Sequence, residues 1–327
     1  MAYSHGIANG HDDLYAKLLA FLTTDPALVA LNQQWDIVWE SSGLVNPQNP
    51  TDKLLRGPGL AGQDQVYVGI RSVALPAQDQ HWFAFRGATG PMATATNYGD
   101  HIKSSGSVRM FTDSGTMEYW MVANGRRFAM VVKISTVFES MYAGLFLPYA
   151  TPLAYPYPLY IGGSAGPEGM SNSVSNWRSE SQYHTQFIAP NATISVSTVE
   201  SGVWLLDPMG QWIRAGTTGT DNNIMLHPRA PAVSWWGSRG ISTGDWSAGL
   251  IEANMVDAYG GGRLLTPYTL TQLNPSLQTY GILDGVFSVA GVANQAENII
   301  QQDGVDHLVV QNVFRSTFYD YWALALE

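Results

Sequence analysis

The feature that most constrains the fold is a pair of apolar segments, 117–123 and 126–134, on either side of Asn124-Gly125. Asn-Gly is the dipeptide that most readily supplies the two positive-φ residues of a type I′ turn, which joins the strands of a tight β-hairpin. We therefore expect an antiparallel pair of strands here, with Asn124-Gly125 in a type I′ turn.

A run rich in aromatic residues and proline follows the hairpin. Residues 138–160 hold five aromatic side chains between positions 142 and 157, and prolines at positions 148, 152, 156 and 158. Proline lacks the N–H group that helices and interior strands use, so the run should be neither helix nor interior sheet. We expect it to lie extended against an apolar surface. No acid, base or nucleophile set accompanies it.

The first part of the chain predicts a small α+β unit. Asp12 is expected to be the N-cap of a helix, and Asp25-Pro26 should open a second, shorter one. The apolar residues of the first helix recur at helical spacing and are Leu14, Leu18, Phe21 and Leu22. Alternation at 65–73 and 81–86 indicates strands, so we expect residues 1–90 to form an α+β docking domain.

The remainder of the chain is expected to be a β-rich domain, 91–327, with two sub-domains that could meet near 165–190. The 87–106 segment is rich in Gly, Thr, Ala and Asn and fits a linker or long loop, and a second hairpin is expected around the turn at 207–210. Further strands are expected at 192–199, 280–289 and 307–326, and 294–302 could form a brief helix. The predicted class is mainly β with a small N-terminal α+β unit, antiparallel sheets and a sandwich-like C-terminal region.

Charged side chains are scarce. They make up 13% of the chain, against about 25% in an ordinary soluble domain, while Trp, Tyr and Met number 11, 16 and 11. Protein contact surfaces are depleted in charge and enriched in aromatic residues and Met, so this composition favours a subunit of an assembly. The alternative is a large core with few charges around it.

Several classes of function fit the composition poorly. The net charge of -10 argues against a nucleic-acid binder, which needs a stripe of Lys and Arg. The absence of Cys excludes disulfides, thiolate zinc sites and cysteine catalysis. We expect no membrane span, because no uncharged apolar run reaches 18 residues, and no secretory signal, so the chain should be made in a cytoplasm.

Three motifs could carry chemistry, and each has a simpler structural explanation. Residues 162–166 match the G-x-S-x-G elbow around Ser164, but Pro167 follows where the elbow needs a helix. Two groups of potential metal ligands have no standard spacing, and turns or caps explain them better: His5, His11, Asp12 and Asp13, and Asp303, Asp306 and His307. We therefore expect no catalytic residue, no metal and no cofactor.

The large aromatic residues are the candidate contact residues. We expect the anchors of subunit contacts to be Trp120, Phe146, Tyr149, Tyr155, Tyr157, Trp235 and Trp236. The alternative for the Trp-rich loops, with Trp246, is a platform that stacks on sugar rings. Paired carboxylates for glycan cleavage stay open, because folding and not sequence spacing brings such pairs together.

Several segments of the sequence together resemble a family of tailed-bacteriophage virion structural proteins. They are the early Leu-x-x-x-Leu helix, 54–62 leading into 66–70, 122–133, 146–149 with 155–159, and 311–315 before 321–323. The resemblance implies a tail or baseplate component with no catalytic residues, located in the virion tail. Its partners would be other virion tail proteins and its own copies, in a three-fold or six-fold ring. Two alternatives stay open: a receptor-interaction domain that binds or cleaves glycan, and a connector of the neck or tail-terminator region.

Overall fold

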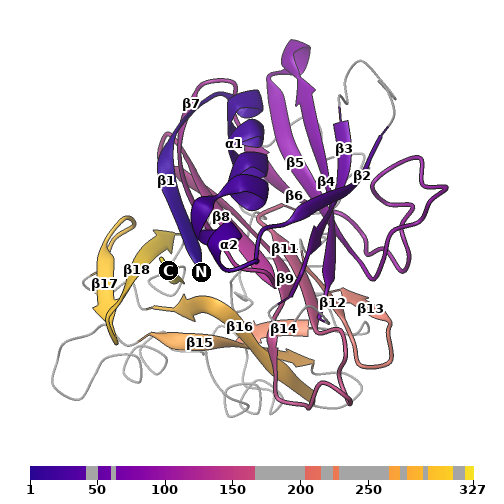
Figure 1. Cartoon of the computed structure of the whole chain (residues 1–327). Coiled ribbons are helices and arrows are strands. Elements are labelled where there is room, and N and C mark those ends of the chain that lie inside the picture. The colour runs from indigo at the N-terminus through magenta and orange to yellow at the C-terminus, as the bar shows by residue number, and fades with distance from the viewer. Residues whose placement is uncertain are drawn as a thin grey trace, which may run out of the picture.

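The structure is a computed structural model of the chain. It describes residues 1–41, 51–59, 64–165, 203–214, 224–227, 265–272, 278–289, 294–311 and 321–327. These residues form three antiparallel sheets with two α-helices near the N-terminus (Figure 1). The predicted class, mainly β with antiparallel sheets, is confirmed.

The central sheet has seven strands and contains the predicted hairpin. Its order is β1 (Ala2–Asn9), β7 (Thr116–Ala123), β8 (Arg127–Ile134), β9 (Val137–Leu145), β11 (Leu159–Gly163), β12 (Val203–Leu206) and β13 (Trp212–Arg214). The β7–β8 and β12–β13 pairs are the two hairpins that the sequence predicts. The strand predicted at 192–199 lies outside the described residues.

A five-stranded sheet and the helices cover one face of the central sheet. The strands are β2 (Asp36–Glu40), β3 (Thr51–Gly57), β4 (Val66–Leu75), β5 (Gln80–Ala88) and β6 (Val108–Thr112). The helices are α1 (His11–Thr24), α2 (Pro26–Ala30) and the 3-10 turn η1 (Pro76–Gln78). We call this layer the helix-side sheet.

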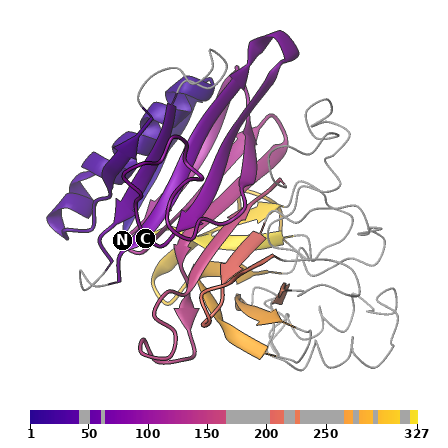
Figure 2. The same ribbon diagram turned by 90° about the vertical axis from the view of Figure 1, so that its right-hand side faces the viewer.

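A C-terminal sheet covers the other face. Its order is β14 (Ile224–His227), β15 (Thr266–Gln272), β16 (Gln278–Ser288), β19 (Tyr321–Ala325), β18 (Val305–Gln311) and β17 (Ile299–Gln302), with β10 (Leu147–Pro148) paired to β16. Figure 2 shows the indigo helix on one side of the stack and the orange and yellow strands on the other. The molecule is therefore layered, with the central sheet in the middle.

Two hydrophobic cores form because the central strands are apolar on both faces. In β7, Met121 packs into the core shared with the helix-side sheet, while Trp120 and Val122 pack into the core shared with the C-terminal sheet. Successive side chains of a strand point to opposite faces, so one strand supplies both cores. This double burial explains why the hairpin segments are apolar almost throughout.

The first helix is confirmed, but its N-cap differs from the prediction. Its four predicted apolar residues are buried in α1. Asp12 lies inside the first turn, and the N-cap is Gly10 at φ 99°, where a Cβ would approach Ser114 O to 2.8 Å. Instead, the Asp13 carboxylate accepts a hydrogen bond from the Asn9 backbone N–H at 2.7 Å. The prediction for α2 is confirmed, since the Asp25 side chain accepts from the Ala27 N–H at 2.9 Å.

The β7–β8 hairpin is confirmed, whereas its predicted turn type is wrong. Neither Asn124 nor Gly125 takes a positive φ. The Asn124 N–H donates to Arg127 O at 3.0 Å, so Gly125 and Arg126 occupy the centre of the turn. The Asn124 side-chain oxygen accepts from the N–H groups of Arg126 and Arg127, and this local bonding replaces the type I′ geometry.

Two other local predictions are also wrong. The aromatic, proline-rich run begins as β9, an interior strand between β8 and β11, because its first proline, Pro148, comes only after that strand has ended. Within 294–302 the structure has a turn and then β17, and no helix. Of the predicted linker or long loop at 87–106, Gly87 and Ala88 belong to the end of β5, and the rest is irregular, with an isolated bridge between Gly90 and Ile102.

Hydrogen bonds join the two ranges that the sequence analysis assigns to separate domains. β1, from the first range, pairs along its whole length with β7, from the second. β6 likewise belongs to the helix-side sheet although it lies beyond residue 90. The division at residue 90 stays a prediction, and the pairing shows that backbone bonds cross it.

Arg127 links the central sheet to the C-terminal sheet. Its side chain is fully buried, and Nε donates to Asp284 Oδ2 of β16 at 3.0 Å. Gly285, at φ 71°, lets β16 pass close by, since a Cβ there would stand 2.2 Å from Arg127 Nη2. Burial alone would raise the pKa of the Asp284 carboxyl, but the charge and hydrogen bond of Arg127 hold it below its ordinary value. The Asp284 carboxyl is therefore ionised at neutral pH.

We predict that Asp284→Asn lowers the free energy of unfolding by about 2 to 4 kcal/mol at pH 7, because it leaves the Arg127 charge buried without its partner. A carboxyl with a lowered folded pKa stabilises above its unfolded pKa, near 3.8, and loses that contribution as the pH falls through the folded value. Urea unfolding at pH 7 and at pH 3 measures this effect: the difference in free energy of unfolding between the native chain and the variant should be smaller at pH 3.

The matched control is Asp79→Asn, at an exposed position with φ 52° that Asn tolerates well. It should change stability by less than about 0.5 kcal/mol. An Asp284→Asn variant as stable as this control would contradict the role given to the ion pair.

Candidate contact surface

The segment Phe146–Pro158, here called the aromatic loop, connects β9 to β11 and is tied to its surroundings by hydrogen bonds. The Phe146 N–H donates to Pro158 O at 2.9 Å, which closes the base of the loop. The Tyr149 N–H donates to Tyr280 O of β16 at 3.0 Å, and the Tyr155 hydroxyl donates to Leu206 O of β12. The loop is thus attached to both the central and the C-terminal sheets.

Two of its aromatic side chains point inward and anchor it. Phe146 and Tyr155 are buried, with their rings edge-to-face at 5.5 Å, and Tyr155 lies 6.1 Å from the Tyr280 ring. Burial raises the pKa of the Tyr155 hydroxyl, and burial together with Asp207 raises that of Tyr280 to about 12. Both hydroxyls therefore remain protonated donors at any physiological pH.

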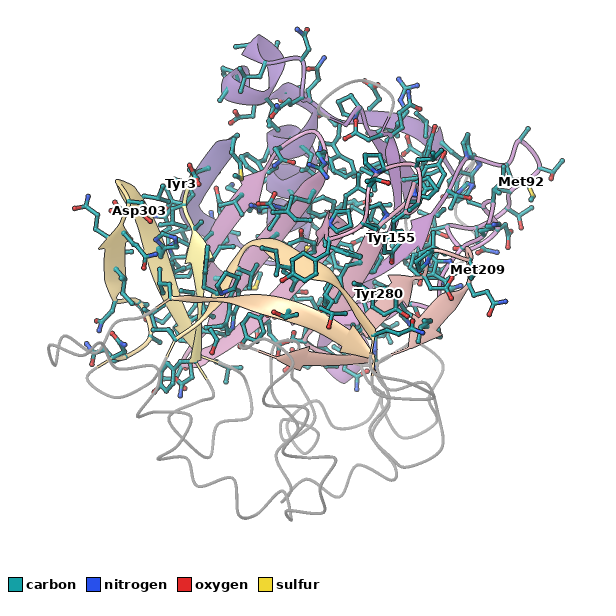
Figure 3. All side chains as sticks on the ribbon, turned by 90° about the horizontal axis from the view of Figure 1, so that it is seen from below. Tyr3, Met92, Tyr155, Met209, Tyr280 and Asp303 are labelled. Carbon is teal, nitrogen blue, oxygen red and sulfur yellow. The ribbon has the colours of Figure 1, made fainter. Side chains whose placement is uncertain are left out.

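The other large side chains of the loop point to solvent. Tyr149 is 64% exposed and Leu153 94%, and Leu147 and Tyr157 are also exposed. We call these four residues the loop surface. The segment contains no charged residue. Met209, 83% exposed, lies in the β12–β13 turn, and Figure 3 shows it on the same side of the molecule as Tyr155 and Tyr280.

The predicted contact residues divide into three groups. Trp120, Phe146 and Tyr155 lie in the core between the central and C-terminal sheets, so packing within the chain accounts for them and they are not surface anchors. Tyr149 and Tyr157 are exposed and belong to the loop surface. Trp235 and Trp236 lie outside the described residues, as does Trp246. Leu147, Leu153 and Met209 are exposed as well but were not predicted, because no periodic pattern marks them.

Ser164, the serine of the G-x-S-x-G match, lies just after β11 and is buried. Its hydroxyl donates to the carboxylate of Glu139, which is buried too, and accepts from the Ser140 N–H at 3.2 Å. A nucleophile must reach an incoming substrate, whereas this hydroxyl joins β9 to the end of β11. The geometry therefore gives Ser164 a structural part in the central sheet.

His11 joins helix α1 to the helix-side sheet. Its Nδ1 lies 2.7 Å from Thr112 Oγ1 and its Nε2 2.7 Å from Ser72 Oγ. Burial, and to a lesser extent the neighbouring His81, lowers the pKa of His11 to about 3. A neutral ring with both nitrogens engaged in this way serves packing between α1, β4 and β6.

The remaining candidate ligands are also explained by local structure. His5 stacks on Trp120 at 5.0 Å and its Nε2 lies 2.9 Å from Glu118 Oε1. Asp303 and Gly304 take φ 53° and 82° between β17 and β18, which confirms the predicted turn. In the part of the chain that the structure describes, no three His, Asp or Glu side chains gather as a metal site would require.

The comparisons with known proteins add no family. No protein-family model matches the chain, and a search of the curated proteins finds no match. Among the helices of the described ranges, none has the length and apolar character needed to cross a membrane.

We predict that His11 makes the chain acid-sensitive. A His with a lowered folded pKa is neutral when folded but protonated when unfolded below about pH 6.5, so stability falls as the pH drops from that value toward 3. His11→Gln keeps hydrogen-bonding groups but cannot be protonated, and should remove up to about 1.4 kcal/mol of this loss per pH unit. Urea unfolding at pH 7, 6 and 5 measures the two slopes.

Thr112→Ser is the control for this slope, because it retains both His11 and the hydroxyl that contacts it. It should shift stability by a similar amount at each pH. Parallel slopes for the native chain and His11→Gln would show that His11 does not set the acid sensitivity.

Proposed function

We propose that this chain is a structural subunit of a bacteriophage tail, most specifically of the baseplate or tail end, and that it works through subunit contacts and not through catalysis. The observation that carries the proposal is the loop surface: large apolar side chains, without charge, presented on a loop held by two buried aromatic anchors. The sequence resemblance to tailed-bacteriophage virion proteins supports the same reading.

A surface of this kind suits protein association. Burying apolar area contributes roughly 25 cal/mol per Å², and Tyr offers a large contact area at low side-chain entropy cost. Because Phe146 and Tyr155 already fix the loop, less conformational freedom is lost when a partner covers Tyr149, Leu153 and Tyr157. The partners would be other virion tail proteins and further copies of the chain.

Two candidate catalytic side chains among the described residues, Ser164 and His11, are engaged in contacts within the chain, which supports a structural role. The Ser164 hydroxyl is buried against Glu139, and both ring nitrogens of His11 contact hydroxyls inside the molecule. The glycan-binding alternative concerns Trp235, Trp236 and Trp246, outside the described residues, and it becomes an outcome of the test below.

We predict that Tyr149→Ser, Leu153→Ser and Tyr157→Ser, combined in one variant, reduce incorporation of the chain into virions at least about tenfold. Removing two or three apolar contacts of about 1 kcal/mol each accounts for a loss of this size. The measurement is quantitative mass spectrometry of purified particles, with cross-linking to identify the neighbours.

The control variant is Val29→Ser with Leu31→Ser, which removes two exposed apolar side chains at α2 and its end. Both variants should unfold at the temperature of the native chain. Absence of the native chain from particles, or equal incorporation of both variants, would overturn the proposal. Binding to host polysaccharide, or release of reducing ends from it, would favour the glycan alternative.

A further inference from the structure

Among the residues that the structure describes, strand β1 forms one edge of the central sheet and has a row of backbone groups with no neighbouring strand. It pairs with β7 without a register shift, from Ala2 opposite Ala123 to Asn9 opposite Thr116. In Figure 1 it lies at the outer margin of the sheet. Tyr3 is 40% exposed and Ile7 50%.

The register shows which groups of β1 are open. The Asn124 N–H donates to Arg127 O, so the even-numbered residues of β7 bond to β8 and the odd-numbered ones to β1. Each β1 residue opposite an odd-numbered β7 residue therefore uses its N–H and C=O groups within the sheet. The residues between them, Tyr3, His5 and Ile7, direct these groups away from it. The Asn9 N–H points the same way and donates to the Asp13 carboxylate.

This edge lacks the features that usually prevent pairing. Edge strands are commonly protected by Pro, charged side chains, bulges or short length. Residues 2–9 contain no Pro and no Lys, Arg, Asp or Glu. At eight residues β1 is also longer than the other strands that end the described sheets, which have three to five: β13, β2, β6, β14 and β17. β2, for comparison, carries Asp36, Glu40 and a register shift.

We propose that β1 pairs antiparallel with β1 of a second copy, joining two central sheets into one across a two-fold axis at His5. The open positions are Tyr3, His5 and Ile7, and an antiparallel pairing of two such rows is symmetric about His5. Tyr3 of one copy then lies opposite Ile7 of the other, an aromatic and β-branched pair of the kind that stabilises sheets. His5 lies opposite His5 of the second copy, and each stacks on its own Trp120. About six backbone hydrogen bonds would form.

This contact is distinct from the loop surface and does not depend on the proposed function. An isologous pair uses the same patch on both copies and closes at two subunits. The dimer would therefore form with purified protein, whether or not the chain belongs to a virion.

The test is the oligomeric state of the full chain by sedimentation velocity over a concentration series. Figures 1 and 2 both place the two termini side by side, and β1 begins at the N-terminus, so tags are removed beforehand. The native chain should sediment as a dimer. Tyr3→Lys with Ile7→Lys should weaken the dimer at least about tenfold, because like charges then face each other across the axis.

A charge-swap partner makes the test specific. Tyr3→Glu with Ile7→Glu should also be monomeric alone, and mixing it with the Lys variant should restore a dimer that contains one copy of each. The control is Val29→Lys with Leu31→Lys, which adds the same charge elsewhere and should leave the native dimer intact.

Ile7→Pro provides a second, backbone-specific variant. It removes an N–H that points away from β7, so the ladder within the chain keeps its bonds. It should abolish the dimer with little change in thermal unfolding. A native chain that remains monomeric at high concentration, or Lys and Glu variants that dimerise as well as the native chain, would overturn the proposal.

Discussion

The whole structure depends on a central sheet that is covered on both faces. A sheet buried in this way needs strands that are apolar on both faces, and residues 119–123 of β7 and 128–132 of β8 meet this need. Two cores form as a result, one toward α1 and the helix-side sheet and one toward the C-terminal sheet. Much of the shortage of charge in this chain follows from that architecture, so composition alone is weaker support for an assembly than the exposed loop surface is.

Much of the fold could be predicted because its signals are periodic or local. The helical spacing of Leu14, Leu18 and Phe21, and the Asp25-Pro26 cap, identify α1 and α2 correctly. Turn geometry was harder to predict, because Asn124 satisfies neighbouring N–H groups with its own side chain. The two successive positive-φ residues expected of a tight hairpin turn occur instead at Asp303 and Gly304. Pairing between distant strands, such as β1 with β7, leaves no mark in the local sequence.

The contact residues were only partly predictable for a related reason. In an irregular, proline-rich loop no period relates one side chain to the next, so sequence cannot say which rings turn inward. Tyr155 points inward because β12 supplies an acceptor, Leu206 O, and β16 supplies the Tyr280 ring, and both strands lie far along the chain. Phe146 packs edge-to-face on the Tyr155 ring. Tyr149 and Tyr157 were left outside. The same residue type therefore serves the core at one position and the surface two residues later.

The two proposed contacts differ in symmetry, and that difference limits what the subunit can build. Pairing through β1 is self-complementary and stops at two copies, so it cannot by itself produce a ring. The loop surface lies mainly on an irregular loop and not along a long strand edge, and it suits a heterologous contact, in which a different patch covers it. A three-fold or six-fold arrangement would thus have to come from the loop surface or its partners, while β1 would join subunits, or rings, in pairs.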